Sequence, residues 1–259
     1  MRSYDFSYER SQPPPRSPSR TPPRHQPRQR TIRRPRRKVG ARRRLPIKGT
    51  LAETYLRARG VTYLDDLSAL RFHPRCYYRA DENAPVETWP AMLAAVTDLD
   101  GTITGVHRTW LARDGSGKAP VATPRRAMGR LLGNGVRFGL MNDVVAVGEG
   151  IETILALRCT LPRMPMIAAL SASHLGALAQ PPSLRRIYVA QDSDDAGRQA
   201  TTTLTERAER AGVRPIALSP RSADVNDDLR RSGRDELATW VHVQLAPEDT
   251  IYALTASAR

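Results

Sequence analysis

The sequence predicts an α/β fold: a parallel sheet with helices on both faces, preceded by a small α+β region and a disordered, basic N-terminal tail. Two apolar runs, Val144–Val147 and Ile187–Ala190, show no polar alternation, which is typical of parallel strands buried on both faces. Each run stops at acidic residues and glycine, and the segment that follows has helical spacing. Successive units of this kind, joined by right-handed crossovers, give a parallel sheet with helices on both faces.

Strands and helices are expected to alternate through this half of the chain, which we place at residues 140–245. After the first run we expect a helix at 152–159, a strand at 166–170, a small-residue loop at 171–174, a helix at 196–211, a strand at 213–218 and a helical region at 224–233. Gly212 stands at the end of one predicted helix, where glycine commonly terminates helices.

Three acidic residues follow the two apolar runs directly. Glu149 follows the first run, and Asp192 and Asp194 follow the second. Ligands collect beyond the carboxyl ends of the strands in open α/β sheets, so we expect these side chains to converge. Carboxylates crowded together repel one another unless a cation lies between them, and hard oxygen ligands suit Mg²⁺. The sequence therefore predicts a metal site at this edge, with Mn²⁺ as the alternative ion.

Acidic residues at helix starts also have a purely structural explanation. Asp195 and Asp224 stand where capping or first-turn acids are common. For Asp192 and Asp194 together we favour metal binding over capping, because they follow a buried strand and are paired with Glu149.

Three motifs, in order and each after a strand, resemble the Toprim domain shared by topoisomerases and bacterial-type primases. They are Gly148–Gly150, Asp192–Gly197 and Asp224–Leu229, and the resemblance covers about residues 140–235. It implies a general acid/base role for Glu149 and metal binding by Asp192 and Asp194, with Asp224 as a further metal ligand. Whether Glu149 transfers protons or serves as a third metal ligand stays open at the level of sequence.

The resemblance implies Mg²⁺-dependent nucleotidyl transfer on a DNA template, the synthesis of short primers by a DNA primase-like enzyme. Such a site orients the α-phosphorus of an incoming nucleotide for attack by a 3′-hydroxyl. With water as the attacking group the same site would cleave phosphodiesters, so a Toprim-type nuclease is the alternative enzyme. A non-catalytic nucleic-acid-binding fragment of a mobile-element primase is the alternative from a different class.

Residues 46–139 are expected to form the small α+β region, beginning with a helix at 50–60. Thr50 as the N-cap, Glu53 three residues later and Gly60 at the end supply a start and a stop for this helix. Its apolar face is expected to continue through Leu64, Leu67 and Leu70.

A hairpin is expected next, formed by Met92–Thr97 and Ile103–Trp110. Asp98 and Asp100 lie in its turn, and we interpret them as turn formers and not as ligands. Alternation along the second strand places His107 and Thr109 on one face, with Val106, Arg108 and Trp110 on the other.

The same region is similar to the segment just upstream of Toprim in primase-like proteins of plasmids, phages and integrated elements. The shared features are His107–Thr109, the loop Asp114–Pro120, and arginines before a glycine-rich hairpin. The resemblance implies that four basic residues lie beside the acidic cluster and face nucleotide or template phosphates: Arg108, Lys118, Arg125 and Arg126. Arginine forks suit triphosphate oxygens. An ordinary basic surface is the alternative for each.

Two cysteines do not indicate a zinc site. His73 and Cys76 are close in sequence, but Cys159 is far away, and a structural zinc site needs four clustered ligands. We interpret Cys76 as structural and His73 as a loop residue. So few cysteines favour a reducing compartment, and we expect a cytoplasmic protein.

The basic charge is concentrated at the N-terminus. Met1–Lys48 holds 16 Lys and Arg and two Asp and Glu, which leaves 25 and 24 for the remainder of the chain. Residues 1–45 are rich in Pro, Arg and Ser and too poor in apolar residues to offset the entropy of ordering, so we expect disorder. Three explanations stay open: a nucleic-acid-binding tail, a solvated tail without a role, and a leader produced by a shifted start or a gene fragment.

The expected partners are a single-stranded DNA template and nucleoside triphosphates. The sequence carries no zinc-binding module and no helicase motor, so a primase of this kind would obtain both from separate proteins, including a helicase. No membrane partner is expected.

Overall fold

The computed structural model describes residues 44–253, all of which belong to one compact unit. The tail predicted for residues 1–45 therefore lies outside the described residues, except for its last two positions. One of these, Leu45, forms a β-bridge with Phe72 in which the Leu45 N–H donates to the Phe72 carbonyl at 2.9 Å.

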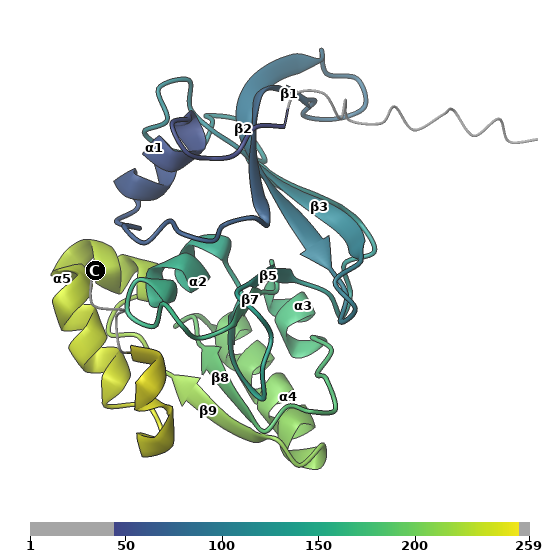
Figure 1. Ribbon diagram of the computed structural model, residues 1–259. Helices are drawn as coiled ribbons and strands as arrows, with labels where there is room; N and C mark the ends of the chain where they lie inside the picture. The colour runs from purple at the N-terminus through teal and green to yellow at the C-terminus, as the bar shows by residue number, and fades with distance from the viewer. Residues whose placement is uncertain (1–43, 254–259) are drawn as a thin grey trace, which may run out of the picture. The chain divides into compact units, whose positions relative to one another are not determined.

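A four-stranded antiparallel sheet with the order β1-β2-β3-β4 forms the first half of the described chain (Figure 1). Its elements are α1 (Leu51–Ala58), β1 (Leu70–Tyr78), β2 (Glu87–Thr97), β3 (Ile103–Trp110) and β4 (Arg125–Gly129). Helix α1 begins as predicted, because Thr50 Oγ1 accepts from the Ala52 N–H at 3.3 Å and Glu53 Oε2 accepts from the Gly49 N–H at 2.6 Å.

The predicted hairpin is present between β2 and β3. Asp98 Oδ1 accepts hydrogen bonds from the N–H groups of Asp100 at 3.2 Å and Thr102 at 2.9 Å. The interpretation of Asp98 as a turn former is therefore confirmed. The predicted alternation along β3 is also seen, since His107 and Thr109 are buried on the face that is turned away from Arg108.

Three segments differ from the prediction. The apolar face of a helix was expected to continue to Leu70, but Leu70 begins strand β1. Leu70 and Phe72 point inward on either side of the exposed Arg71 and pair with β2. Strand β4 was not predicted, since its residues gain regular structure by pairing with β3. The predicted loop at 171–174 includes the start of a short helix, α3 (Ala172–Gly176), capped by the Ser171 hydroxyl.

A five-stranded sheet with the order β5-β7-β6-β8-β9 forms the second half. Its strands are β5 (Val136–Phe138), β6 (Val144–Gly148), β7 (Met166–Ala168), β8 (Arg186–Ala190) and β9 (Arg214–Leu218). Strands β7, β6, β8 and β9 run parallel, as predicted, whereas β5 pairs with β7 in the antiparallel direction at one edge. The helices are α2 (Ile151–Arg158), α3, α4 (Asp195–Arg210) and α5 (Val225–His242).

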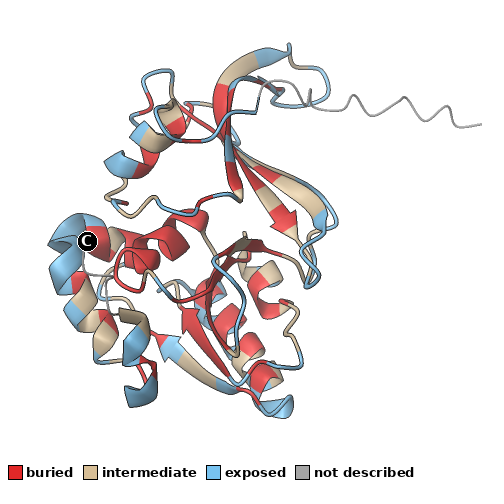
Figure 2. Cartoon of the chain, viewed as in Figure 1, coloured by how far each residue is buried: buried red, intermediate tan, exposed pale blue. Residues whose placement is uncertain are grey.

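Helices cover both faces of this sheet, as the sequence predicted (Figure 1). Successive residues of β6 alternate between two hydrophobic cores: Val144 and Ala146 pack in the core that includes α2 and α5, and Val145 and Val147 pack in the core that includes α3 and α4. Figure 2 shows the consequence, because β6, β8 and α2 are buried along their lengths while α5 keeps an exposed outer face. None of the helices between residues 44 and 253 has the length and apolar character needed to cross a membrane.

A buried ionic network fixes the last described element, the 3₁₀ helix η2 (Pro247–Ala253), to strand β8. Arg186 hydrogen-bonds to both Asp249 and Glu248, and the Tyr188 hydroxyl donates to Asp249 Oδ2 at 2.7 Å. Arg186 and Asp249 are both buried, so the two charges compensate each other inside the protein.

Candidate active site

Four carboxylates lie at one edge of the parallel sheet. Glu149 follows β6, and Asp192 and Asp194 follow β8, its neighbour in the sheet. Asp224 lies between β9, the next strand, and α5. The carboxyl ends of parallel strands meet at the same edge, so the topology gathers the predicted acidic residues.

The charges of these carboxylates act on one another. Burial, followed by the charges of Glu149, Asp224 and Asp194, raises the pKa of Asp192 to about 7. Burial, followed by the charge of Asp194, also raises the pKa of Glu149. Two acidic side chains whose charged forms are disfavoured, both at the carboxyl edge of a parallel sheet, are typical of a functional site.

A divalent cation fits these residues. Asp192 Oδ1 is buried and has no hydrogen-bond partner, although a buried carboxylate oxygen is normally satisfied. Between residues 44 and 253, no three acidic, histidine or cysteine side chains are already close enough together to enclose an ion. Mg²⁺ does not need such a cage, because it keeps several waters and uses one or two carboxylates together with substrate phosphates. Asp192 is therefore the best-placed ligand.

Two of the acidic residues also cap helices. Asp194 Oδ1 accepts from the Gly197 N–H at 2.7 Å at the start of α4, and Asp224 Oδ1 accepts from the Asp227 N–H at 2.8 Å at the start of α5. Asp224 thus caps a helix, as its structural explanation predicted, and Asp194 also caps one, although metal binding was favoured over capping for it. Each cap occupies one carboxylate oxygen and fixes the side chain in place.

Gly197 determines how closely α4 approaches Asp192. A Cβ atom at position 197 would lie 2.7 Å from the Asp192 carbonyl oxygen and 2.8 Å from its Cβ. Only glycine allows this contact, which holds the Asp192 backbone against the first turn of α4. The spacing Asp-x-Asp-x-x-Gly in the sequence carries this requirement, although the sequence analysis attached no role to the glycine.

The four predicted basic residues do not all lie beside the acidic cluster. Arg125 does, because its charge offsets part of the rise in the pKa values of both Asp192 and Glu149. Arg108 and Arg126 are a cross-strand pair on the opposite face of the four-stranded sheet, where Arg108 stacks on the Trp110 ring at 4.9 Å. The expectation that all four face the acids is therefore wrong for these two, because adjacent residues of a strand point to opposite faces.

Arg126 is held in place by its neighbours. Its guanidinium donates to the carbonyls of Arg79 and Ala80, both at 2.7 Å, and lies over the Tyr78 ring at 5.2 Å. Cys76 packs in the same small core as Tyr78, and both Cys76 and Cys159 are buried, free thiols.

Lys118, the fourth predicted basic residue, pairs with a buried acid that the sequence analysis missed. Its Nζ lies 3.4 Å from Glu152 Oε1, and the same oxygen accepts a hydrogen bond from the Tyr55 hydroxyl at 2.5 Å. The available signal was a single charged residue in the first turn of α2, followed by an apolar run. His107 lies nearby, and burial lowers its pKa to about 4, so it is neutral at physiological pH.

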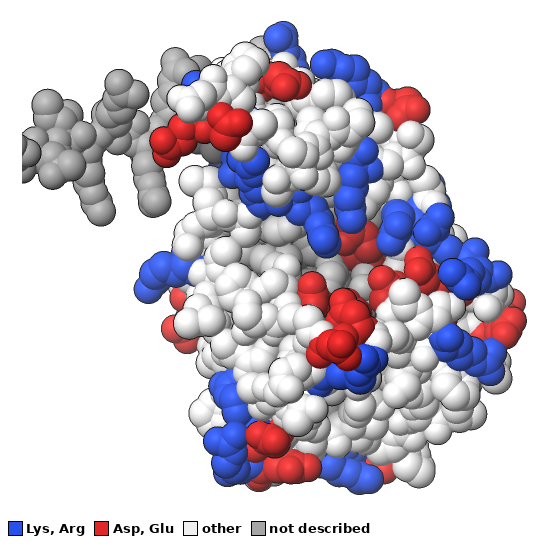
Figure 3. Space-filling view, turned by 180° about the vertical axis from the view of Figure 1, so that it is seen from behind, with Lys and Arg blue, Asp and Glu red and all other residues white. Residues whose placement is uncertain are grey.

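Charged side chains gather around a hollow on one face of the molecule (Figure 3). Figure 3 shows acidic side chains around this hollow, with Lys and Arg side chains along one margin of it.

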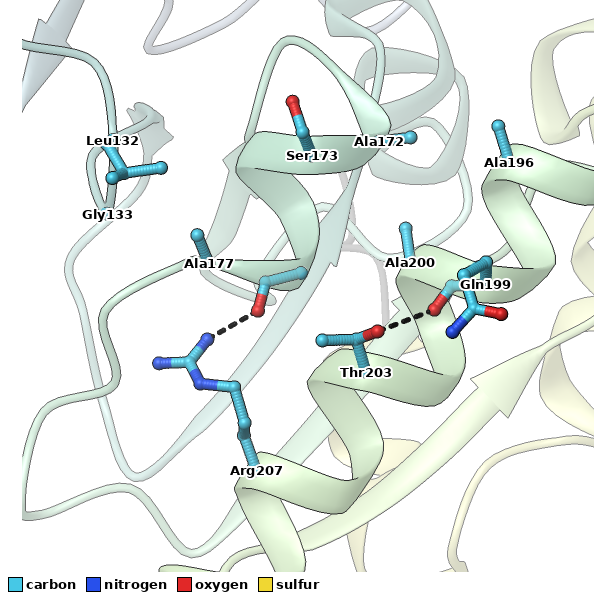
Figure 4. A pocket seen from close by; sticks show the side chains of 11 residues that line it. Leu132, Gly133, Ala172, Ser173, Ala177, Ala196, Gln199, Ala200, Thr203 and Arg207 are labelled. Carbon is cyan, nitrogen blue, oxygen red and sulfur yellow. Dashed lines mark hydrogen bonds between the residues drawn. The ribbon is translucent and has the colours of Figure 1, made fainter.

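Figure 4 shows a separate pocket of about 690 Å³, lined by small residues of α3 and α4 together with Leu132 and Gly133. Arg207 closes one end of this pocket by donating to the Gly176 carbonyl at 2.6 Å. None of the predicted site residues lines it.

Comparison with known families assigns the two halves of the described chain. Residues 144–235 match the Toprim domain family, and residues 30–138 match a domain of unknown function, DUF7146. No curated protein matches the chain.

Solved structures of primases resemble the chain at low sequence identity. The structure of the zinc-binding and RNA polymerase domains of Aquifex aeolicus primase is 16% identical, with a TM-score of 0.51; the match covers 77% of this chain and 57% of that one. The RNA polymerase domain of Mycobacterium tuberculosis primase, in complex with a double-stranded DNA oligomer, is 15% identical over 80% of this chain and 77% of that one, with a TM-score of 0.48. The primase fragment of the bacteriophage T7 primase-helicase protein is 13% identical over 74% and 70%, with a TM-score of 0.46.

Proposed function

We propose that this Toprim-domain protein is a Mg²⁺-dependent nucleotidyltransferase that synthesises short primers on a single-stranded DNA template. One observation carries the proposal: Asp192 presents a buried oxygen without a hydrogen-bond partner among three further carboxylates, at the carboxyl edge of a parallel sheet. The fold shared with the Aquifex primase supports the choice of reaction, although the chain spans only 57% of that structure.

The acidic residues would have two different roles, metal binding and proton transfer. Asp192 and Asp194 would hold the cation, with Asp224 as a further ligand through the oxygen that its helix cap leaves over. When bound, Mg²⁺ neutralises phosphate charge and orients the α-phosphorus. Glu149 would accept the proton of the attacking 3′-hydroxyl, because its raised pKa brings a carboxylate closer to the working pH of a general base.

The basic residues would bind phosphates on two surfaces. Arg125 and Lys118 are the candidates for binding the nucleotide. The charge of Arg125 acts on Asp192, and Lys118 pairs with Glu152. Arg108 and Arg126 lie on the other face of the four-stranded sheet and would contact the template backbone.

Primer synthesis can be tested directly. Purified protein is incubated with single-stranded DNA, Mg²⁺ or Mn²⁺ and labelled ribonucleotides, and the products are separated by size. Short labelled products support the proposal, whereas a shortened template supports the nuclease alternative. Neither product, together with retained DNA binding, supports the non-catalytic alternative.

Three variants connect the activity to the site. Asp192→Asn combined with Asp194→Asn should abolish synthesis, because the amides keep the shape of the side chains but remove the anionic ligands. Glu149→Gln should reduce turnover more than metal binding. Asp195→Asn is the matched control, because this neighbouring side chain is 99% exposed and pairs only with Arg198.

The proposed setting is the cytoplasm, with a separate helicase to expose the template. The two free, buried cysteines suit a reducing compartment. Co-purification of a helicase from cells that express the protein, followed by stimulation of primer synthesis by that helicase, tests the partnership.

A further inference from the structure

Glu152 is a buried carboxylate to which the proposed chemistry assigns no role. It lies in the first turn of α2, three residues after Glu149, and is 6% exposed. Burial by itself raises the pKa of Glu152, but Lys118 and the Tyr55 hydroxyl outweigh burial and hold the pKa below its usual value. Glu152 is therefore a charged group inside the protein.

A buried charge is retained only where its partners compensate for lost hydration. The partners of Glu152 come from other parts of the chain: Tyr55 from α1 and Lys118 from the loop after β3. The charge of Arg125, on β4, also acts on Glu152. One carboxylate of the Toprim domain thus attracts groups from three segments of the preceding region.

Arg125 connects this buried group to the acidic edge. The charge of the same guanidinium offsets part of the rise in the pKa values of Glu149 and Asp192. Lys118 and Arg125 therefore both act on the charge of Glu152, and Arg125 also acts on the acidic edge.

Lys118 remains able to bind a second anion. Its side chain is 30% exposed and ion-paired with Glu152, and an ammonium group has three donors, which leaves donors for a second anion. The loop that carries Lys118 packs closely against α1, since a Cβ atom at Gly115 would lie 3.0 Å from Thr54 Cβ. A lysine tethered at both its backbone and its ammonium group is a preorganised phosphate ligand.

We propose that Glu152 is a positioning residue that orients Lys118 toward the triphosphate of a nucleotide bound at the acidic edge. The identity of the ligand rests on the proposed function, but the positioning itself does not require turnover. Glu152 touches no substrate and acts only through Lys118.

The test measures ATP binding by calorimetry in the presence of Mg²⁺. Glu152→Gln and Lys118→Met should each weaken ATP binding about tenfold, and the double variant should bind no more weakly than either single variant. Tyr55→Phe is the matched control, because it removes a hydrogen bond from the same carboxylate oxygen without touching Lys118. It should lower the melting temperature and leave ATP affinity within about twofold of wild type.

Several results would overturn the positioning role. The role is refuted if wild type does not bind ATP or if Glu152→Gln binds ATP as tightly as wild type. It is also refuted if Glu152→Gln and Tyr55→Phe lose the same ATP affinity, or if the losses of the Glu152→Gln and Lys118→Met variants add up in the double variant. If Lys118→Met does not fold because it leaves a buried charge unpaired, the double variant, which contains no unpaired charge, is compared with Glu152→Gln instead. Affinities that follow the expectation, combined with no primer synthesis by wild type, uphold the positioning role and refute the proposed function.

Discussion

Replacing Asp192 with asparagine should stabilise the metal-free protein at neutral pH, although it destroys the proposed site. Burial and three neighbouring carboxylates raise the pKa of Asp192 from 3.8 to about 7. A carboxyl group whose pKa is higher in the folded state than in the unfolded state favours folding while it is protonated. That contribution is complete below about pH 4 and is lost as the pH rises through about 7.

The size of the effect follows from the pKa difference. Each pKa unit is worth about 1.4 kcal/mol, so the shift of Asp192 sets an upper limit of roughly 4 kcal/mol at alkaline pH. Asp192 keeps partial solvent contact, and we expect about half of this value, or about 2 kcal/mol. For a folded unit of this size, this corresponds to an increase of about 4–8 °C in the melting temperature.

The assay is thermal unfolding of wild type and Asp192→Asn at about pH 5 and about pH 8, with a chelator and with excess Mg²⁺. The variant should melt higher than wild type at the higher pH in chelator, and the difference should shrink at the lower pH. Mg²⁺ should raise the melting temperature of wild type but not that of Asp192→Asn, because it binds the native carboxylates. Asp195→Asn should match wild type in every condition, including the response to Mg²⁺, because its side chain is exposed and the proposed ligands are intact. A variant that is less stable than wild type at about pH 8 without metal, or a difference independent of pH, would refute the reasoning.

Three further predictions concern other parts of the chain. Gly197→Ala should destabilise the protein by about 1–3 kcal/mol in chemical denaturation, because its methyl group would collide with the Asp192 backbone; an increase in stability, the usual result of Gly→Ala in a helix, would contradict the close packing. Asp249→Ala should lower the free energy of unfolding by about 3–5 kcal/mol, because it leaves the buried Arg186 guanidinium without its buried partner; a loss below about 1 kcal/mol would show that η2 does not anchor β8. Deletion of residues 1–44 should reduce nucleic-acid affinity most at low salt and flatten its salt dependence, measured by fluorescence anisotropy; an unchanged salt slope would remove the tail from binding.

The second half of the fold could be predicted because its signals are local. The runs at Val144–Val147 and Ile187–Ala190 are apolar at every position, and buried parallel strands are the common reason for such a run. The first half was less predictable. Strand β1 depends on pairing between residues 70–78 and β2, and its Leu70 fits an apolar spacing of three as well as it fits a strand. The partner strand decides between the two, and local spacing does not identify that partner.

The candidate site shows the same division between local and long-range information. The acidic residues follow their strands in sequence, so topology alone is enough to bring them together. The arginines depend on register: Arg125 and Arg126 are adjacent, and only the pairing of β4 with β3 determines which one turns toward the acids. Glu152 could not be assigned partners at all, because Tyr55 lies 97 residues away in the sequence.

Asp194 and Asp224 each cap a helix in addition to their proposed role in metal binding. The caps explain how four carboxylates can stay at one edge of the sheet without a metal ion. Four free carboxylates at one edge would repel one another and splay apart, since each could rotate toward water. The hydrogen bonds from Gly197 and Asp227 hold one oxygen of each capping residue and tie it to the first turn of its helix. The positive ends of α4 and α5 also offset part of the negative charge. Asp192 caps no helix and its buried oxygen has no hydrogen-bond partner, so burial and the remaining repulsion together raise its pKa to about 7. The residue with the greatest need for a cation is therefore also the one left free to bind it.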